Sequence, residues 1–270
     1  MARIESKIPG NALPAAHTAA RAAGEVIRRA RGGEFRIDHK GATDMVTEVD
    51  LASEEKIIAI ISEAFPSHRI VAEEGGGGRK ETGYTWWIDP LDGTTNFIHG
   101  YPCYSVSIAL EYRREIILGV IYDPIREELF SACRGEGATL NGRSLSVSTN
   151  TSLEDSLLAT GFPYNRSRRR YALSVAARLL EKIHGLRRGG SAALDLAYVA
   201  AGRLDGYWEF GLKPWDTAAG ILLVEEAGGK VSDFRGNRFK IDNGEILASN
   251  PVICRPLLEV MAGEDEQKEF

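Results

Sequence analysis

Residues 84–97 read YTWWIDPLDGTTNF, and they join an apolar strand, two carboxylates and a helix start. Each residue from Thr85 to Ile88 is either β-branched or aromatic, which favours a buried strand. Pro90 predicts the end of that strand, because proline has no N–H to donate to a strand ladder. We therefore expect the chain to turn directly after Asp89.

That turn combines acidity with the backbone chemistry of an anion site. Asp92 and Gly93 favour a turn, the glycine lets a ligand approach the backbone closely, and the N–H groups of Thr94 and Thr95 remain free at a helix start. Carboxylates and a bound anion repel each other unless a divalent cation lies between them, and oxygen ligands of this kind favour Mg²⁺. The turn therefore predicts a site for Mg²⁺ and phosphate. An acidic capped turn without a ligand is the alternative.

The composition is typical of a globular protein rather than a disordered, fibrous or membrane chain. Of 270 residues, 43% are hydrophobic and 26% are charged, and the formal net charge of −5 argues against broad nucleic-acid binding. No segment approaches the roughly 20 apolar residues of a membrane span, and Met1 to Pro9 lacks a targeting pattern, so we expect a cytoplasmic protein. The widely separated Cys103, Cys133 and Cys254 predict reduced core thiols.

Two helices and a strand are predicted before the turn. Ala15 to Arg31 has helical spacing and stops at a glycine pair, and Ser53 to Ile61 continues as a second helix. Asp50 lies near the start of the second helix, where it is either an N-cap or a catalytic residue. Arg69 to Ala72 has the pattern of a short strand.

Two adjacent acids, Glu73 and Glu74, follow that short strand. Adjacent carboxylates repel each other unless they are exposed or share a cation, so these residues form either a solvated hairpin tip or part of a metal site. The run from Gly75 to Gly78 cannot form a rigid wall. We hypothesise that it is a mobile lid beside the site.

The chain after the turn changes character halfway. Three closely spaced strand-like runs predict an antiparallel meander: Tyr104 to Leu110, Ile116 to Tyr122 and Glu128 to Ala132. The turn signal Leu140 to Arg143 marks a boundary, so we expect an α+β half at residues 1–142 and an α/β half at residues 143–270.

Helices alternate with short apolar runs in the second half. They are predicted at Tyr171 to His184, Ala192 to Ala201 and Pro214 to Ala227. Asp216 lies in the first turn of the last helix, where the helix dipole alone favours an acid. Together with Glu73, Asp89 and Asp92, it would add a fourth acid to one crevice, because an α/β layout can bring such ends together.

Three motifs carry a resemblance to a known family. Asp89-Pro90-Leu91-Asp92-Gly93-Thr94-Thr95-Asn96 follows Glu73-Glu74 and precedes Trp215-Asp216-Thr217-Ala218-Ala219-Gly220. In this combination the chain resembles the inositol monophosphatase family of Mg²⁺-dependent, Li⁺-sensitive phosphatases. The segment 190–202 is similar to the bacterial inositol-1-monophosphatase branch.

The resemblance implies an αβαβα layered fold, a small phosphorylated polyol or sugar as substrate, a homodimer and no membrane partner. It also implies a role for each matched position. Glu73, Asp89 and the Leu91 carbonyl would bind one Mg²⁺, and Asp89, Asp92 and Asp216 a second. Glu74 would act through water, and Asp50 with Thr94 would hold and deprotonate the attacking water. Gly93, Thr94 and Thr95 would contact the phosphate, and Gly190, Ser191, Ala192 and Glu209 would line the alcohol side.

Two other functions remain open at this stage. The first is a fructose-1,6-bisphosphatase or a dual-specificity sugar phosphatase, in which an arginine clamps a second phosphate; the candidates are Arg166, Arg168, Arg169, Arg170, Arg187 and Arg188. The second is a regulatory protein that binds RNA or a transcription factor through the basic run from Arg166 to Arg170. That run has no interleaved aromatic residues and the net charge is negative, so nucleic acid is not the expected partner.

Overall fold

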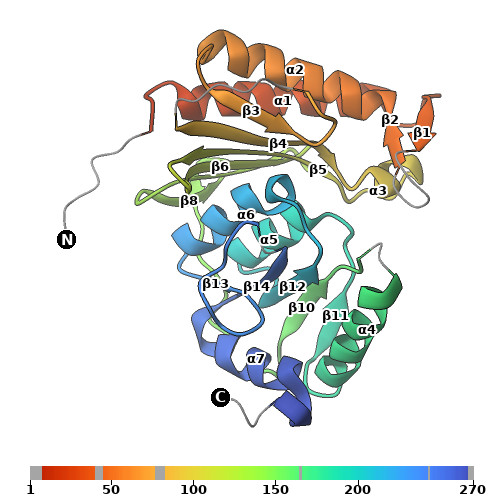
Figure 1. Cartoon of the computed structure of the whole chain (residues 1–270), viewed down its shortest axis with the longest axis vertical. Helices are drawn as coiled ribbons and strands as arrows, with labels where there is room; N and C mark the ends of the chain where they lie inside the picture. The colour runs from red at the N-terminus through yellow and green to blue at the C-terminus, as the bar shows by residue number, and fades with distance from the viewer. Residues whose placement is uncertain (1–7, 40–44, 77–82, 164–165, 243, 267–270) are drawn as a thin grey trace.

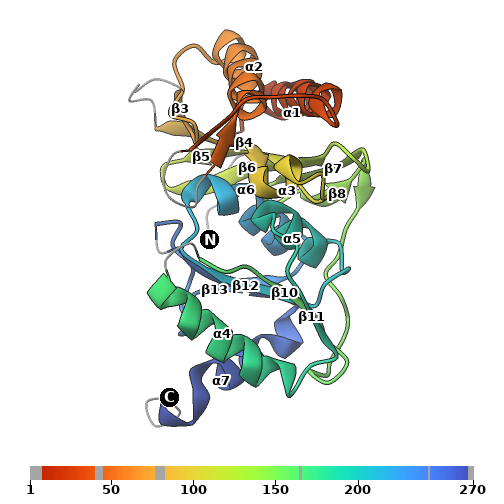
Figure 2. The same ribbon diagram turned by 90° about the vertical axis from the view of Figure 1, so that its right-hand side faces the viewer.

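The computed structural model describes residues 8–39, 45–76, 83–163, 166–242 and 244–266, which form five stacked layers (Figure 1). Helices α1 (Ala12–Ala30) and α2 (Glu48–Ala64) cover one sheet, and α4 (Arg166–Leu180) and α7 (Pro251–Glu266) cover another. Helices α5 (Ala192–Ala200) and α6 (Pro214–Glu226) lie between the two sheets, as a view turned by 90° also shows (Figure 2). The expected αβαβα layering is confirmed.

The larger sheet contains the predicted meander. Its strands, in spatial order, are β3 (Arg69–Ala72), β4 (Tyr84–Asp92), β5 (Ser105–Tyr112), β6 (Glu115–Asp123), β7 (Glu128–Cys133), β8 (Gly137–Leu140) and β9 (Arg143–Ser144). Only β3 and β4 are parallel in this sheet, and the strands from β4 to β9 are antiparallel. Strand β9 still pairs with this sheet, and the proposed boundary at residues 142 and 143 falls directly before it.

The smaller sheet belongs to the second part of the chain. Its spatial order is β11 (Gly185–Arg187), β10 (Leu157–Thr160), β12 (Gly206–Phe210), β14 (Glu245–Ser249) and β13 (Lys230–Ser232). Strand β10 is parallel to β11 and to β12, whereas β14 is antiparallel to β12 and to β13. A separate two-stranded ribbon pairs β1 (Ile37–His39) with β2 (Met45–Thr47), and the short helix α3 (Thr94–Ile98) follows β4.

The predicted strand end at Pro90 is wrong. Strand β4 continues to Asp92, and its pairing with β5 shifts between Asp89, opposite Ser107, and Asp92, opposite Ser105. Proline is tolerated there because a bulge leaves its position outside the regular ladder. The bulge therefore delivers both aspartates on one continuous strand instead of separating them by a turn.

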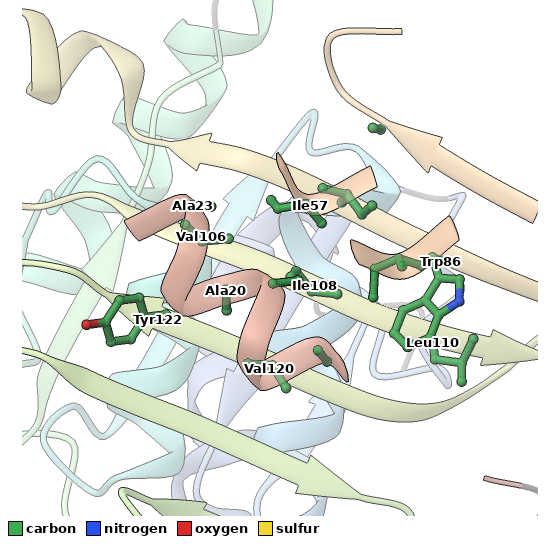
Figure 3. Packing of buried hydrophobic residues seen from close by; sticks show 14 of the residues in the cluster. Ala20, Ala23, Ile57, Trp86, Val106, Ile108, Leu110, Val120 and Tyr122 are labelled. Atoms are coloured by element: carbon green, nitrogen blue, oxygen red, sulfur yellow. The ribbon is translucent and has the colours of Figure 1, made fainter. Parts of the chain in front are cut away.

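The two faces of β4 pack against two different hydrophobic cores. Trp86 and Ile88 join the core beneath α1 and α2, where Ala20 and Ala23 of α1 approach the sheet closely (Figure 3). Trp87 alternates to the opposite face and contacts the core formed around α5 and α6. Because residues two apart share a face, Asp89 lies on the same side as Trp87, towards the central helices.

The three helices predicted in the second half are present, with ends shifted by up to five residues. The predicted helix Tyr171 to His184 is α4, which begins earlier and ends earlier. Helix α7 was not predicted, because Pro256 lies within it and obscures the helical pattern. Within the described ranges, no helix is both long enough and apolar enough to cross a membrane.

Gly119 sets the distance between β6 and α6. A Cβ atom built on Gly119 would lie 2.7 Å from the carbonyl oxygen and 2.9 Å from the Cα of Ala219, both of them backbone atoms. Backbone atoms cannot rotate away, so Gly119→Ala is expected to push α6 from the sheet and lower the free energy of unfolding by about 1–3 kcal/mol. Urea denaturation measures this change.

Gly10→Ala provides the matched control, because a Cβ atom at Gly10 meets no atom within 4 Å. If Gly119→Ala unfolds at the same urea concentration as Gly10→Ala, the close packing of α6 on β6 does not limit stability.

Candidate active site

A cavity of about 310 Å³ lies where the ends of several elements meet. Strands β3 and β4 contribute their carboxyl ends, and α3, α5 and α6 contribute their first turns. The predicted site residues that line it are Glu73, Asp89, Leu91, Asp92, Gly93, Thr94, Thr95, Gly190, Ala192, Glu209 and Asp216. The remaining three, Asp50, Glu74 and Ser191, do not line the cavity. Asp50 and Ser191 bond to residues that do, whereas the N–H of Glu74 donates to Glu54 behind it.

Three aspartates of this cavity are each fixed by backbone or hydroxyl donors. The N–H of Leu91 donates to Asp89 at 3.0 Å, and the N–H of Lys213 donates to Asp216 at 2.7 Å. Asp92 accepts the hydroxyl of Ser191 at 2.5 Å and the N–H of Ala193 at 2.8 Å. These bonds orient the carboxylates before any ligand binds. Ser191 is thereby a residue that positions Asp92.

The same carboxylates raise one another's pKa. Burial raises the pKa of Asp89 well above its ordinary value, and the charges of Glu73, Asp92 and Asp216 raise it further. Burial also raises the pKa of Asp92 to about 6, against the opposing hydrogen bonds from Ser191 and Ala193. Burial likewise raises the pKa of Asp216, and repulsion from Asp92 and Glu73 raises it further. Two cations, Arg188 and Lys213, also line the cavity, and the charge of Arg188 lowers the pKa of Asp92.

The chemistry of these donors fits a hard divalent cation. Carboxylate oxygens together with the Leu91 carbonyl are the ligands that Mg²⁺ prefers, and repelling carboxylates in one cavity are stabilised by a cation between them. As the side chains stand, no three Asp, Glu, His or Cys residues in the described part of the chain converge into a complete metal-binding group. The division of these ligands between two Mg²⁺ ions thus stays a prediction.

Asp50 and Thr94 form a hydrogen-bonded pair beside the carboxylates. Asp50 is fully buried, and its Oδ1 accepts the Thr94 hydroxyl at 2.8 Å. Its Oδ2 accepts the backbone N–H of Thr47 at 2.9 Å and the Thr47 hydroxyl at 2.5 Å. The N-cap of α2 is Thr47, and Asp50 is the third residue of a capping box. Asp50 therefore has a capping role and a link to the cavity at the same time.

Gly93 allows α3 to begin at the cavity wall. Its φ of 101° lies in the left-handed region, and a Cβ there would lie 3.0 Å from the carbonyl oxygen of Cys103 and 3.2 Å from that of Gly190. Any side chain would thus separate the Asp92 turn from the segment that carries Gly190. The backbone at Gly93 therefore packs closely against the backbone of Cys103 and Gly190 within the fold.

The loop after β3 is anchored by a residue to which we assigned no role from the sequence. Glu54 of α2 is 4% exposed, and its two carboxylate oxygens accept the N–H groups of Glu74 and Gly76, each at 2.8 Å. Glu54 thereby fixes the backbone that presents Glu73 to the cavity. A buried acid inside a helix gives no sequence signal, because charged helical residues are ordinarily solvated. Of the proposed lid, Gly77 and Gly78 lie outside the described residues.

The opposite wall contains Glu209 and Arg188. Tyr207 donates its hydroxyl to Glu209 at 2.5 Å, and burial raises the pKa of Glu209 to about 7, while the Tyr207 bond and the charge of Arg188 oppose the rise. The Glu209 carboxylate also fills the space beside Gly161, where a Cβ would lie 2.0 Å from its Oε2. A hydrogen-bond acceptor, Glu209, and a hydrogen-bond donor, Arg188, on one wall suit a ligand with several hydroxyl groups.

Glu209 makes the stability of the ligand-free protein depend on pH. Its folded pKa of about 7 exceeds the ordinary value of 4.5, so its contribution is complete below pH 4.5 and is lost as the pH rises through about 7. We expect Glu209→Gln to reduce the loss of unfolding free energy between about pH 5 and pH 8. Urea unfolding at both pH values measures it.

Glu63→Gln on the exposed side of α2 serves as the control, because it should leave the pH dependence unchanged. A Glu209→Gln protein with the full wild-type difference would show that the Glu209 carboxyl titrates normally.

Comparisons with known proteins show which family shares this sequence and architecture. Residues 11–264 match the Inositol monophosphatase family. The Nus factor SuhB of Pseudomonas aeruginosa is 50% identical over 249 residues, which cover 89% of this chain and 92% of that protein. Extragenic suppressor protein SuhB of Bartonella henselae superposes with a TM-score of 0.91 at 41% identity, covering 93% of this chain and 98% of that one. An inositol monophosphatase of Anabaena has a TM-score of 0.84 at 43% identity, with 96% and 98% covered.

The superpositions show that this chain shares its five-layered fold with those solved structures. The match extends over nearly all of the chain, including every residue predicted for the site. The protein belongs to the inositol monophosphatase family.

Proposed function

We propose that the protein is a Mg²⁺-dependent phosphatase that hydrolyses inositol 1-phosphate to inositol and phosphate. The observation that carries the proposal is the meeting of Glu73, Asp89, Asp92 and Asp216, from three distant segments, in one cavity beside Thr94. Family membership supports the phosphatase class. The substrate is inferred from the site and from the family resemblance.

The carboxylates and the Leu91 carbonyl would hold the cations. Bound Mg²⁺ neutralises charge on the phosphoryl oxygens, activates water and stabilises the leaving alkoxide. The protein's own contribution is to keep Asp92 and Asp216 oriented through the donors at Ser191, Ala193 and Lys213. Orientation in advance lowers the cost of assembling the reacting groups.

Thr94 and Asp50 would hold the attacking water and take its proton. Because the Thr94 hydroxyl already donates to Asp50, its oxygen is left to accept a hydrogen bond from water. A proton lost by that water can pass through the Thr94 hydroxyl to the Asp50 carboxylate. Glu74, which bonds through its N–H to Glu54 behind the cavity, would act on the same water only through further water.

The phosphate and the alcohol would occupy different parts of the cavity. The N–H groups of Gly93, Thr94 and Thr95, at the start of α3, would donate to phosphate oxygens. Glu209 would accept hydroxyl groups of the polyol, and the backbone of Gly190 and Ala192 would border the ring. Ser191 would act indirectly, because its hydroxyl is committed to Asp92.

The test is phosphate release from inositol 1-phosphate with Mg²⁺, with EDTA, and with Mg²⁺ plus Li⁺. We expect release only with Mg²⁺ and suppression by Li⁺. Turnover that is equal in EDTA would refute the metal role. Light scattering of the same protein tests the homodimer that the resemblance implies.

A second candidate is fructose-1,6-bisphosphate hydrolysis. Of the arginines considered as a clamp for the second phosphate, Arg188 lines the cavity, whereas Arg168 and Arg170 are exposed on α4. Arginine binds phosphate oxygens with two parallel donors, so Arg188 could hold the second phosphate. Comparing kcat/KM for the two substrates decides between them, and a large preference for the bisphosphate would overturn the first proposal.

A regulatory role beside the catalytic one is favoured by the name of a relative, Nus factor SuhB. We propose that exposed Arg168 and Arg170 of α4 contact a partner of the transcription machinery. Replacing both with glutamate should weaken partner binding in a pull-down and leave phosphate release intact. If partner binding survives the replacement, α4 is not the contact.

A further inference from the structure

A second and larger cavity, of about 690 Å³, lies apart from the candidate active site. It is bordered by β3 to β6, by the far end of α6 and by the segment 238–242, all within the described residues. Its volume is in the range of small-molecule sites, which is roughly 300–1,000 Å³. Neither the proposed reaction nor its substrates use any residue of this cavity.

Strand register explains how the cavity wall forms. Thr85 of β4 lies opposite Arg69 of β3 and opposite Glu111 of β5, and Glu111 lies opposite Ile116 of β6. Directly opposed residues point to the same face of a sheet, so these four side chains form one row across four strands. Trp87, two residues further along β4, continues the same face.

Four exposed cations line this second cavity. Arg69, Arg114, Arg238 and Lys240 line the cavity, and none of them forms an ion pair with a described carboxylate. They come from three separate segments: β3, the turn between β5 and β6, and the loop before β14. Unpaired guanidinium and ammonium groups around an opening attract a multiply charged anion.

The lining also contains a fifth cation, Arg134, and four acids, so its net charge is only slightly positive. Glu225 pairs with Arg134 at 2.5 Å, and Glu115 lies 3.9 Å from the same arginine. Glu111 accepts the indole N–H of Trp87 at 3.1 Å. Asp242 is the remaining acid of the lining, and it is exposed at the rim. Of the five cations only Arg134 is paired with described acids, so the other four can donate to phosphate oxygens.

The inner wall is apolar and aromatic. Trp87, Phe239 and Ile241 are partly buried and pack on the central core, and Ile116 and Ile221 complete the wall. The bond to Glu111 fixes the plane of the Trp87 ring. Such a wall suits a flat aromatic group, whereas the hydroxyl groups of a sugar phosphate would find few partners there.

We propose that this cavity binds a nucleoside polyphosphate, with the base against Trp87 and Phe239 and the phosphates at the four rim cations. The site needs no divalent ion, because four cations without an ion pair to a described acid can donate to the phosphates directly. The candidate active site has the opposite character, since its acids repel anions until a cation is present. The two cavities share no lining residue, although both use β4 and α6: Thr85 and Trp87 precede Asp89 on β4, and Ile221 and Glu225 follow Asp216 on α6.

ADP is the probe, and the full chain is titrated by calorimetry in EDTA so that the candidate active site does not contribute. We expect saturable binding that Arg238→Glu weakens at least tenfold, because it replaces a donor to phosphate with a repelling charge. Arg235→Glu is the matched control. It makes the same change of charge on the same exposed loop without lining the cavity, so affinity should stay within about twofold.

A spectroscopic measurement separates this site from any other. ADP should quench tryptophan fluorescence in the wild type, and Trp87→Phe should remove most of the quenching while circular dichroism shows an unchanged fold. The proposal is overturned if ADP gives no saturable binding up to about 5 mM, or if Arg235→Glu and Arg238→Glu weaken it equally. It is also overturned if an adenylate oligonucleotide binds here more tightly than ADP, since the cavity would then be part of a nucleic-acid surface. All of these measurements are independent of phosphatase activity.

Discussion

Asp92→Asn is expected to lower kcat/KM for inositol 1-phosphate by about 10³-fold while the protein stays folded. The asparagine Oδ1 can still accept the Ser191 hydroxyl and the Ala193 N–H, so the bonds that join α5 to the turn persist. The amide NH₂ then replaces the other carboxylate oxygen. It removes one ligand charge and presents hydrogen atoms to the cation.

A second measurement shows whether the loss comes from the cation. Mg²⁺ should raise the thermal midpoint of the wild type but not that of Asp92→Asn, because a ligand stabilises only the form that binds it. Asp155→Asn, an exposed position, is the control and should keep both activity and the Mg²⁺ effect. Near-normal turnover by Asp92→Asn would remove Asp92 from the proposed ligands.

Thr94→Ala is expected to lower kcat about 10²-fold with little change in KM. The substitution deletes the hydroxyl that joins Asp50 to the cavity at 2.8 Å, and it also deletes a donor to the Leu91 carbonyl at 3.1 Å. Substrate contacts made by the backbone N–H groups of α3 remain. A group that positions the attacking water affects the transition state more than the bound substrate.

Thr94→Ser separates the chemical role from packing. Serine restores the hydroxyl without the methyl group, so it should recover most of kcat, whereas Thr94→Val keeps the shape and should remain slow. Steady-state kinetics at saturating Mg²⁺ measures all three variants. If valine is as active as serine, the hydroxyl of Thr94 does not take part in the reaction.

Much of the fold could be predicted because its signals are local. The helix from Ala15, the strand Arg69 to Ala72 and the meander after Tyr104 all appear close to their predicted places. Two errors arise where tertiary contacts override a local signal. At Pro90, β4 continues through a bulge whose existence depends on pairing with β5. In α7, Pro256 masks a helix that is held by packing against α4 and β14.

The candidate site likewise has some features that the sequence predicts and others that it does not. Asp89, Asp92 and Thr94 are close along the chain, so their proximity follows from the sequence. The roles found for Glu54 and Ser191 do not, because each acts on a residue of a different element. The bond from Tyr207 to Glu209 lies within β12, but alternation along a strand does not by itself show that the two side chains bond. A buried acid on a helix and a serine before a helix look ordinary until their partners are known.

Local patterning specified the larger helices apart from α7, most strands and the acidic turn, since spacing, capping and turn residues act over a few neighbours. Family motifs then indicated which acids belong together. The meeting of Glu73, Asp89, Asp92 and Asp216, and that of the cations lining the second cavity, came from strand register and from the packing of α6 on β6. Such contacts join residues more than a hundred positions apart, and long-range packing rather than local propensity fixes them.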